Sequence, residues 1–374
     1  MRVRAALVET PGDDFQIADL ELVADLAADE VLVEIAATGM CQTDLHIARR
    51  EYPVPFPVVP GHEGAGIVRR TGSDVIGLEP GDAVILSYPS CGRCRACLRQ
   101  EAPYCDEGFR LSFGGARLAG DRALRRGDEA IHGHIFQQSS FATWAISTSR
   151  NTIKVPDFAM HLPLEQLGPL GCSLQTGAGT VLRSLNVSSG ESLVVVGVGA
   201  VGLAAVMAAA SAEADAIVAV DVVPSRLAMA RELGATHIVD ARVTDLVAGV
   251  RAVLPGGADH VIELSGRPDN LGRALEATRL GGTVAFVAGT PSGTTAEIDL
   301  NTLLNGRRVR GVIQGDAMSA DFIPQLLRLH VDGRFPFERL ISFYDLDDIQ
   351  RAADGLRSGS AIKPVVRMPI GTAD

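Results

Sequence analysis

Four of the six cysteines lie within fifteen consecutive positions, and their spacing is typical of a metal site. They follow the pattern Cys-x2-Cys-x2-Cys-x7-Cys, formed by Cys91, Cys94, Cys97 and Cys105. Four thiolates close a tetrahedral zinc site and leave no position for a substrate, so the zinc would be structural. The alternative is an iron–sulfur cluster, because Cys-x2-Cys-x2-Cys also begins a ferredoxin motif. That motif continues x3-Cys-Pro, whereas the fourth cysteine here comes later and is followed by Asp106.

A second motif predicts a dinucleotide site. Residues 194–202 read V-V-V-G-V-G-A-V-G, a Gly-x-Gly-x-x-Gly fingerprint between a predicted strand and a predicted helix. Its first glycine permits a tight turn, its second lets the backbone approach a pyrophosphate, and its third lets the helix pack closely on the strand. The N–H groups at the start of the helix would bind the phosphates. The residues assigned to this site are Gly197, Gly199, Ala200, Val201 and Gly202.

Asp221 ends the next predicted strand, where a carboxylate can accept hydrogen bonds from the adenosine ribose of NAD. The same charge would repel a 2′-phosphate, so NAD is favoured over NADP. Arg226 could flank this ribose, which leaves NADP open. The alternative for the whole motif is a glycine-rich turn that binds no nucleotide.

The two remaining cysteines, with one histidine, form a possible second metal set. Cys41 lies in G-M-C-Q-T-D-L-H, His62 in G-H-E-G-A-G, and Cys172 in G-C-S-L-Q-T-G. Two thiolates and one imidazole are the ligands of a catalytic zinc whose fourth position is left to water or substrate. The three residues are far apart along the chain, so their types alone do not show that they meet.

The secondary structure that must position these residues is predicted to change along the chain. Short β-branched runs such as 31–35 and 83–86, separated by Pro-Gly and Gly-Asp turns, predict a strand-rich region up to about residue 160. Beyond residue 171, buried strands alternate with helices, which indicates a doubly wound parallel sheet. Its strands are predicted at 193–196, 216–220, 237–239, 261–264 and 283–287, and its helices at 201–212, 225–233 and 271–280.

Composition excludes several classes of function. The chain has 374 residues, which suggests about two domains. A net charge of −11 argues against a nucleic-acid or anionic-membrane partner, since both need concentrated positive charge. No apolar run approaches the roughly 20 residues that span a bilayer, and the N-terminus lacks the apolar region of a signal peptide. The expected location is therefore cytoplasmic.

With these motifs in place, the sequence resembles the zinc-containing medium-chain alcohol dehydrogenases. The signature is Gly-His-Glu-x2-Gly-x5-Gly-x2-Val over residues 61–75, and the cysteines and the nucleotide fingerprint follow in that family's order. The resemblance covers essentially the whole chain. It implies an α/β fold with a GroES-like, β-rich catalytic domain at 1–172 and 315–374 and a Rossmann NAD-binding domain at 173–314. It also implies an active site in the cleft between them and a homo-oligomer, either dimer or tetramer.

The resemblance assigns roles at the site. Cys41, His62 and Cys172 would hold the catalytic zinc, with Glu63 behind the metal and Asp44 orienting His62. Zinc lowers the pKa of bound water from 15.7 to about 7, and it should likewise favour deprotonation of a bound alcohol. The relay that the family uses would take the proton through Thr43, a cofactor ribose hydroxyl and His46, whose ordinary pKa suits the task. Gln42 replaces a phosphate-binding arginine, and Lys363 would contact the pyrophosphate.

Cysteine at position 172 favours the alcohol branch of the family over the polyol branch. The segments 113–144 and 171–179 resemble those of bacterial aryl-alcohol and allylic terpene-alcohol dehydrogenases. The expected substrates are therefore primary aromatic or allylic alcohols, oxidised reversibly to aldehydes. Two alternatives stay open: a glutathione-adduct formaldehyde dehydrogenase of the same family, and a non-enzymatic NAD(H)-binding relative.

Overall fold

The computed structural model describes residues 1–369, which form two compact units. The first contains residues 1–172, 318–328 and those from 338 onward; the second contains 173–317 and 329–337. The expected boundary between Cys172 and Ser173 coincides with the boundary between the units. The chain returns to the first unit at residue 318 rather than 315, and 329–337 group with the second. The predicted catalytic domain also included residues 370–374, which lie outside the described part.

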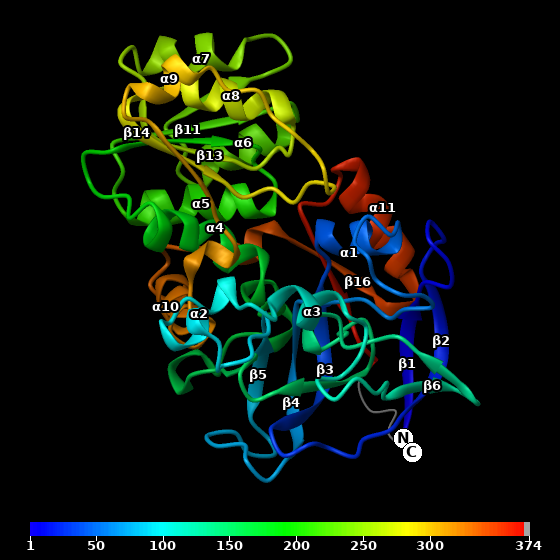
Figure 1. The fold of residues 1–374 in the computed structure, drawn as a ribbon. Helices are drawn as coiled ribbons and strands as arrows, with labels where there is room; N and C mark the ends of the chain where they lie inside the picture. The colour runs from blue at the N-terminus through cyan, green and yellow to red at the C-terminus, as the bar shows by residue number, and fades with distance from the viewer. Residues whose placement is uncertain (370–374) are drawn as a thin grey trace. The chain divides into compact units, whose positions relative to one another are not determined.

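The first unit is built on two β-sheets (Figure 1). An antiparallel sheet of order β1-β2-β6-β7 is formed by Arg2–Leu7, Gln16–Leu22, Leu124–Arg126 and Glu129–Ile131. A larger sheet runs β16-β17-β3-β4-β5-β9, and β8 also pairs with β3. In chain order its strands are β3 (Glu30–Gly39), β4 (Gly64–Thr71), β5 (Ala83–Leu86), β8 (Trp144–Thr148), β9 (Thr152–Lys154), β16 (Ile341–Asp345) and β17 (Lys363–Arg367).

Strand β3 organises the larger sheet because three other strands pair with it. It is antiparallel to β4, β8 and β17, and β17 brings the end of the chain beside the end of β3, with Val365 opposite Gly39. Gly66 of β4 pairs with Ile35, and a Cβ there would lie 2.1 Å from the Glu34 carbonyl oxygen. The second glycine of the signature is thus required by this close strand approach.

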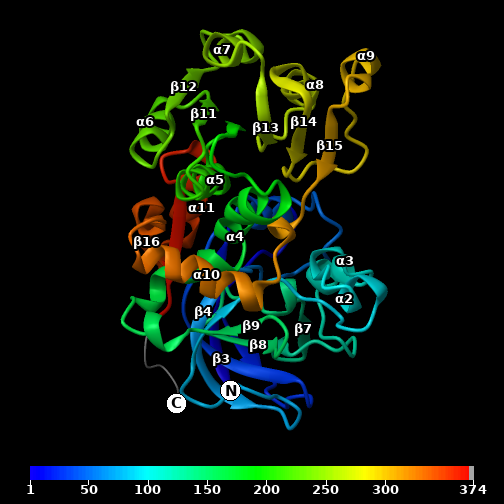
Figure 2. The same ribbon diagram turned by 90° about the vertical axis from the view of Figure 1, so that its left-hand side faces the viewer.

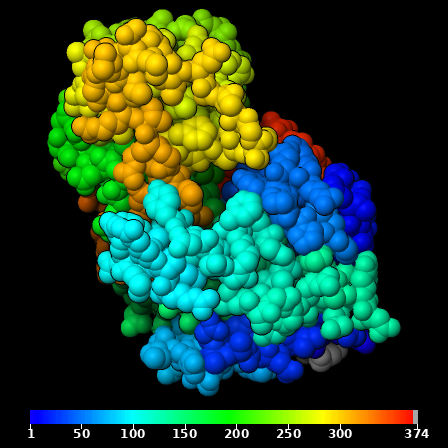
Figure 3. All heavy atoms as spheres, viewed as in Figure 1, coloured from blue at the N-terminus to red at the C-terminus, as the bar shows by residue number. Residues whose placement is uncertain are grey.

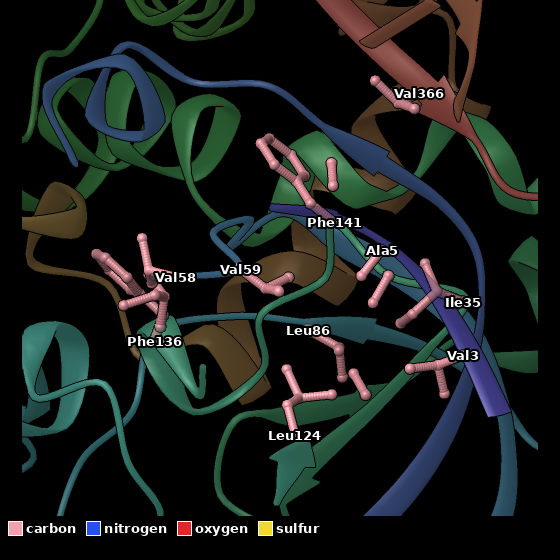
Figure 4. Packing of buried hydrophobic residues seen from close by; sticks show 14 of the residues in the cluster. Val3, Ala5, Ile35, Val58, Val59, Leu86, Leu124, Phe136, Phe141 and Val366 are labelled. Atoms are coloured by element: carbon pink, nitrogen blue, oxygen red, sulfur yellow. The ribbon is translucent and has the colours of Figure 1, made fainter. Parts of the chain in front are cut away.

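The core of the first unit lies between its sheets and the segment around residue 136. Strand residues that alternate inward, such as Val3, Ala5 and Ile35, are buried together with Phe141 (Figure 4). Burying apolar surface contributes about 25 cal/mol per Å², so this cluster is the main stabilising feature of the unit. Its helices are α1 (Gln42–Ala48), α2 (Arg95–Leu98), α3 (Gly108–Phe113) and α11 (Ile349–Ser358), and α10 (Ser319–Val331) runs across the segment boundary at residue 328.

The second unit is a doubly wound parallel sheet of order β12-β11-β10-β13-β14-β15 (Figure 2). Its strand order reverses between β10 and β13, and ligands of such sheets bind at the carboxyl ends of the strands at this point. Figure 1 shows α7 and α8 on one side of the sheet and α5 on the other. The strands are Ser192–Val196, Ala216–Asp221, His237–Asp240, Ala258–Glu263, Thr278–Phe286 and Arg308–Gly311 for β10 to β15. The helices are Ser173–Gly179, Ala200–Ser211, Pro224–Glu232, Leu246–Val253, Pro268–Ala277 and Leu300–Leu304 for α4 to α9.

Most of the alternation predicted for this unit is confirmed within a few residues, but the helix predicted at 271–280 and the strand predicted from 283 have wrong boundaries. The helix expected at 271–280 begins at Pro268 and ends at Ala277, because residues 278–280 already belong to β14. The prediction also omitted α4, α7, α9 and β15. Within residues 1–369, no helix has both the length and the apolar character needed to cross a bilayer.

Candidate active site

The four clustered cysteines converge at one point in the first unit. The sulfur of Cys97 lies 3.9 Å from that of Cys91 and 3.5 Å from that of Cys94, and Cys94 lies 3.9 Å from Cys105. A tetrahedral zinc with Zn–S bonds of about 2.3 Å separates neighbouring sulfurs by about 3.8 Å. The observed separations match one zinc ion. Several iron and sulfide ions would need their thiolates further apart, so the geometry disfavours the iron–sulfur alternative.

The local chain shows why this cluster needs a metal. Helix α2 has no buried residue, and of residues 91–105 only Ala102 belongs to the hydrophobic core cluster of the unit. Backbone N–H groups of Cys97 and Asp106 lower the pKa of the Cys94 thiol to about 6, which favours the thiolate that binds zinc. Figure 3 shows this segment, in cyan, at the surface of the face in view. Metal ligation, rather than burial, holds it in place.

The second predicted metal set also comes together, with one addition. One ligand atom from each of Cys41, His62, Glu63 and Cys172 lies within 4.8 Å of the others. Cys41 caps the N-terminus of α1 directly after β3, His62 precedes β4, and Cys172 ends the first segment of the unit. The fold thus brings Cys172 together with two ligands that lie more than a hundred residues before it in the sequence.

Asp44 holds two of these ligands in position. One carboxylate oxygen accepts hydrogen bonds from His62 Nδ1 (2.9 Å) and the Gly61 backbone N–H (3.1 Å), and the other accepts from the backbone N–H of Cys41 (2.9 Å). Asp44 is fully buried. A carboxylate behind a histidine is the arrangement that orients a metal-bound imidazole.

The other ring nitrogen of His62 supplies the test of whether a metal fits. His62 is buried, yet its Nε2 has no hydrogen-bond partner among residues 1–369. A buried polar atom without a partner costs about 1–3 kcal/mol, and a metal ion would remove that cost. Two thiols and one imidazole are one of the ligand sets that hold zinc at catalytic sites.

The electrostatics of the cluster favour a cation. A hydrogen bond from the Cys172 thiol lowers the pKa of Cys41 well below its ordinary value, and the same bond together with burial raises the pKa of Cys172. Burial lowers the pKa of His62, but the Asp44 carboxylate outweighs it and holds that pKa well above its usual range. The lowered pKa of Cys41 favours its thiolate, the form in which cysteine binds a divalent ion.

Lys363 is not where the resemblance placed it. Its Nζ lies 3.0 and 3.2 Å from the two carboxylate oxygens of Glu63 and donates to the Met40 carbonyl oxygen at 3.0 Å. The residue is 2% exposed. All three N–H donors of Lys363 are directed at groups inside the first unit. The expected contact with a pyrophosphate is therefore corrected: Lys363 forms an ion pair with Glu63 behind the metal ligands. Burial raises the pKa of Glu63, and Lys363 opposes that shift.

Both residues of the expected proton relay lie on α1. The Thr43 hydroxyl is 3.9 Å from the Cys41 sulfur, and His46 is one turn further along the helix. The Nδ1 atom of His46 is hydrogen-bonded to the Glu51 carboxylate, which sequence reasoning did not identify. The imidazole is 21% exposed, so His46 has access to solvent.

A row of aromatic rings joins His62 to His46, and the sequence did not reveal it. Phe136 stacks on His62 at 4.6 Å, Phe113 meets Phe136 edge-on at 5.5 Å, and Tyr52 stacks on Phe113 at 4.4 Å. The ring of His46 lies 6.2 Å from that of Tyr52. Burial and the charges of Cys41, Glu51 and Cys172 raise the pKa of Tyr52, which keeps its hydroxyl neutral. We refer to Tyr52, Phe113 and Phe136 as the aromatic row.

In the second unit, the glycine fingerprint has the geometry that a dinucleotide requires. Gly197 has a φ of +93°, and Gly199 caps the helix that Ala200 and Val201 begin. A Cβ at Gly202 would lie 2.1 Å from the Gly197 carbonyl oxygen, whereas one at Gly199 would meet nothing within 4 Å. Gly202 is therefore required by packing, and Gly199 leaves open space where a ligand can approach the backbone.

Asp221 lies at the end of β11, beside the fingerprint. Its carboxylate accepts hydrogen bonds from the backbone N–H groups of Val198 (2.8 Å), Val222 (2.7 Å) and Val223 (2.9 Å). It therefore also holds the glycine loop, which the sequence did not indicate. Arg226 lies nearby on α6, and its buried Nε has no hydrogen-bond partner within the described residues.

Comparisons with known proteins agree with this geometry. Residues 27–157 match the alcohol dehydrogenase GroES-like domain, and residues 200–331 match the family described as zinc-binding dehydrogenase. Geraniol dehydrogenase of Castellaniella defragrans is 42% identical over 341 residues, which is 90% of each chain. The crystal structure of benzyl alcohol dehydrogenase from Acinetobacter calcoaceticus superposes with a TM-score of 0.94 at 42% identity, covering 99% of this chain and all of that one. A zinc-binding domain protein from Burkholderia ambifaria gives a TM-score of 0.96 at 47% identity, covering 99% of each chain.

Proposed function

The chain belongs to the zinc-containing medium-chain alcohol dehydrogenases, and from that premise we propose that it oxidises primary aromatic or allylic alcohols to aldehydes with NAD. The observation that carries the proposal is the convergence of Cys41, His62 and Cys172 around an unpartnered imidazole nitrogen. A protein that held only a structural zinc would not need this second set of metal ligands. All three ligands are present, which argues against the non-enzymatic alternative.

Each residue of the site has a defined task in this reaction. Zinc held by the two thiolates and the imidazole supplies a Lewis acid that makes an alcohol hydroxyl easier to deprotonate. The alcohol loses a hydride from carbon and a proton from oxygen, and NAD is the hydride acceptor. The Thr43 hydroxyl lies next to the ligands, and it would accept the proton of the alcohol while its own proton passes along the relay toward His46. His46 would exchange that proton with solvent while Glu51 holds its Nδ1. Asp44 keeps the His62 ring oriented.

The aromatic row supports an unsaturated substrate. Its first ring, Phe136, stacks on the metal ligand His62, and its three rings contact one another in stacked or edge-on geometry. Offset-stacked and edge-to-face contacts between rings are worth about 0.5–1.5 kcal/mol beyond their buried area. An aryl group that reached this row would gain such contacts, and an allyl group would gain apolar contact with it, whereas ethanol would gain little of either. The names of the geraniol and benzyl alcohol dehydrogenases that resemble this chain agree with that choice.

NAD is the proposed cofactor because the Asp221 carboxylate would repel a 2′-phosphate. The cytoplasm is the proposed compartment, since no disulfide joins any of the six cysteines within residues 1–369 and reducing conditions keep cysteines in this state. We further propose a homodimer or homotetramer that acts on small molecules, without a nucleic-acid or membrane partner.

The test is steady-state oxidation of benzyl, cinnamyl, geranyl and ethyl alcohols, followed through NADH absorbance with NAD or NADP. We expect kcat/KM for the three unsaturated alcohols to exceed that for ethanol by about tenfold or more, since differences of 1–3 kcal/mol are typical of apolar pockets. NADP should be the poorer acceptor, and a chelator should abolish turnover.

A variant links the substrate preference to the aromatic row. Phe113→Leu should lower kcat/KM for benzyl alcohol about tenfold and leave ethanol nearly unchanged. Phe141→Leu is the matched control, because Phe141 is buried against Phe15 and does not belong to the row. Equal kcat/KM for ethanol and benzyl alcohol in the unsubstituted enzyme would remove the aryl and allyl assignment.

A further inference from the structure

The side-chain amide of Gln138 is buried next to the metal ligands, and both its nitrogen and its oxygen form hydrogen bonds. Its Nε2 donates to the carbonyl oxygens of His62 (3.0 Å) and Ser87 (3.1 Å), and its Oε1 accepts from the backbone N–H of Gly64 (3.1 Å). The residue is 2% exposed. It therefore joins the backbone around His62 and Glu63 to the chain just after β5.

Ser87 extends this connection to the third ligand. Its hydroxyl donates to the carbonyl oxygen of Gly171 at 2.7 Å, and Gly171 directly precedes Cys172. A Cβ at Gly171 would lie 1.9 Å from the Leu86 carbonyl oxygen, so the two segments are in direct contact. A continuous path of hydrogen bonds thus runs from the His62 backbone through Gln138 and Ser87 to the residue before Cys172.

The backbone around Gln138 is held in a costly conformation. Four of its neighbours, none of them glycine, have φ values between +50° and +56°: His134, Phe136, Gln137 and Ser139. Such residues cost of order 1–3 kcal/mol each and persist only where the surroundings enforce them. Hydrogen bonds from the segment hold it in this form, among them Ser139 Oγ to the Val59 carbonyl oxygen. The strained turn directs the Gln138 amide toward the ligand backbones.

We propose that Gln138 is a positioning residue that sets the separation between His62 and Cys172 at the catalytic zinc site. The amide bridges the adjoining ends of β4 and β5, just beyond the pairing of Ala65 with Ile85, and it fixes both through backbone groups. Without it, His62 and Cys172 would relax independently, and the site would hold zinc less tightly. The inference rests on the metal site of the proposed function and is independent of which alcohol is oxidised.

Gln137 provides a matched control. It is the adjacent residue in the same strained turn, is 3% exposed, and also has a bonded amide. Its Nε2 donates to the carbonyl oxygens of Leu111 and Ala116, which carry no ligand of the catalytic cluster. Methionine at either position keeps the length of the side chain and removes the amide. A general loss of packing would therefore affect both variants alike, whereas loss of positioning would affect only one.

The experiment measures zinc per chain and the rate of zinc transfer to a chromogenic chelator for the wild type, Gln138→Met and Gln137→Met. Partners behind metal ligands typically change metal affinity by 10–100-fold. We expect Gln138→Met to release one of its two zinc ions at least tenfold faster than the wild type, with Gln137→Met close to the wild type. With Co²⁺ in the catalytic site, the visible absorption bands should shift in Gln138→Met alone.

Equal release rates and unshifted cobalt bands for the two methionine variants would overturn the inference. If Gln138→Met does not fold, Ser87→Ala is the deciding variant, because it removes only the hydroxyl, which is bonded to the Gly171 carbonyl oxygen and to the Ser319 hydroxyl. Faster release of one zinc would support the inference, and an unchanged rate would overturn it. A wild-type chain that binds a single zinc would contradict the proposed function itself, which separates the two failures.

Discussion

At the scale of single residues, the ion pair between Lys363 and Glu63 has the largest consequence. Both side chains are almost completely buried, and they are 300 positions apart in the sequence. Removing two charges from water is costly, and a pair of this kind is stable only because each partner compensates the other. Loss of one partner leaves the other charge buried without compensation beside the metal ligands.

Lys363→Met should therefore destabilise the first unit by about 3–5 kcal/mol, the usual cost of breaking a buried pair. The double variant Lys363→Met with Glu63→Gln should recover part of this loss, because no uncompensated carboxylate remains. Urea unfolding of the wild type, both single variants and the double variant measures the coupling. Arg126→Met, which breaks surface ion pairs with Glu9 and Glu129, is the control and should cost about 1 kcal/mol. A double variant less stable than Lys363→Met alone would contradict this reasoning.

At the scale of elements, the segment that carries the four clustered cysteines depends on its metal. Helices α2 and α3 together contribute only Leu111 and Ser112 as buried residues. A zinc site of this kind contributes folding free energy directly, because the ligands are not preorganised in the unfolded chain. The segment should therefore be the first part of the unit to lose structure when zinc is removed.

Cys105→Ser should remove one zinc per chain and expose residues 91–115 to proteolysis. The remaining three thiolates cannot complete the tetrahedron, and little apolar contact replaces it. Metal analysis and mapping of cleavage sites by mass spectrometry check both effects. The catalytic zinc should remain, since none of its ligands lies in this segment. A Cys105→Ser chain with two zinc ions and wild-type resistance to protease would show that the segment folds without its metal.

At the scale of the whole molecule, the chain leaves the first unit at Cys172 and returns to complete it. Strands β16 and β17 extend the larger sheet from the far end of the sequence, and Val366 pairs with Thr38 just before the first metal ligand. Each unit has a hydrophobic cluster of its own. The integrity of the metal site thus depends on the last strand, while the glycine fingerprint depends on a separate core.

Val366→Asp should unfold the first unit and spare the second. An aspartate at this fully buried position costs several kcal/mol, a large share of the 5–15 kcal/mol that typically stabilises a domain. We expect loss of the catalytic zinc but retained binding of AMP, which needs only the adenosine part of the nucleotide site. Calorimetric titration with AMP and zinc analysis are the measurements. Val243→Asp, at an exposed position of the second unit, is the control, and parallel loss of AMP binding would refute the independence of the units.

Much of this molecule follows from local sequence. The spacing of Cys91 to Cys105, the glycine fingerprint and the alternation of strands and helices each reflect a physical requirement met within a few tens of residues. These features predicted the tetrathiolate cluster, the parallel sheet and the position of Asp221. Cys41, His62 and Cys172 were chosen by type and resemblance, and the fold brings them within 4.8 Å of one another, which sequence separation alone could not show.

Tertiary structure decided what depends on contacts between distant segments. Lys363 lies behind the metal because β17 pairs with β3, and the aromatic row and the Gln138 bridge exist because the turn at 134–139 packs against His62. Periodicity and spacing describe a chain over short distances, whereas these contacts join residues about 70 to 300 positions apart. Burial and hydrogen bonding between segments this far apart in the sequence arise only when the chain folds and its core packs.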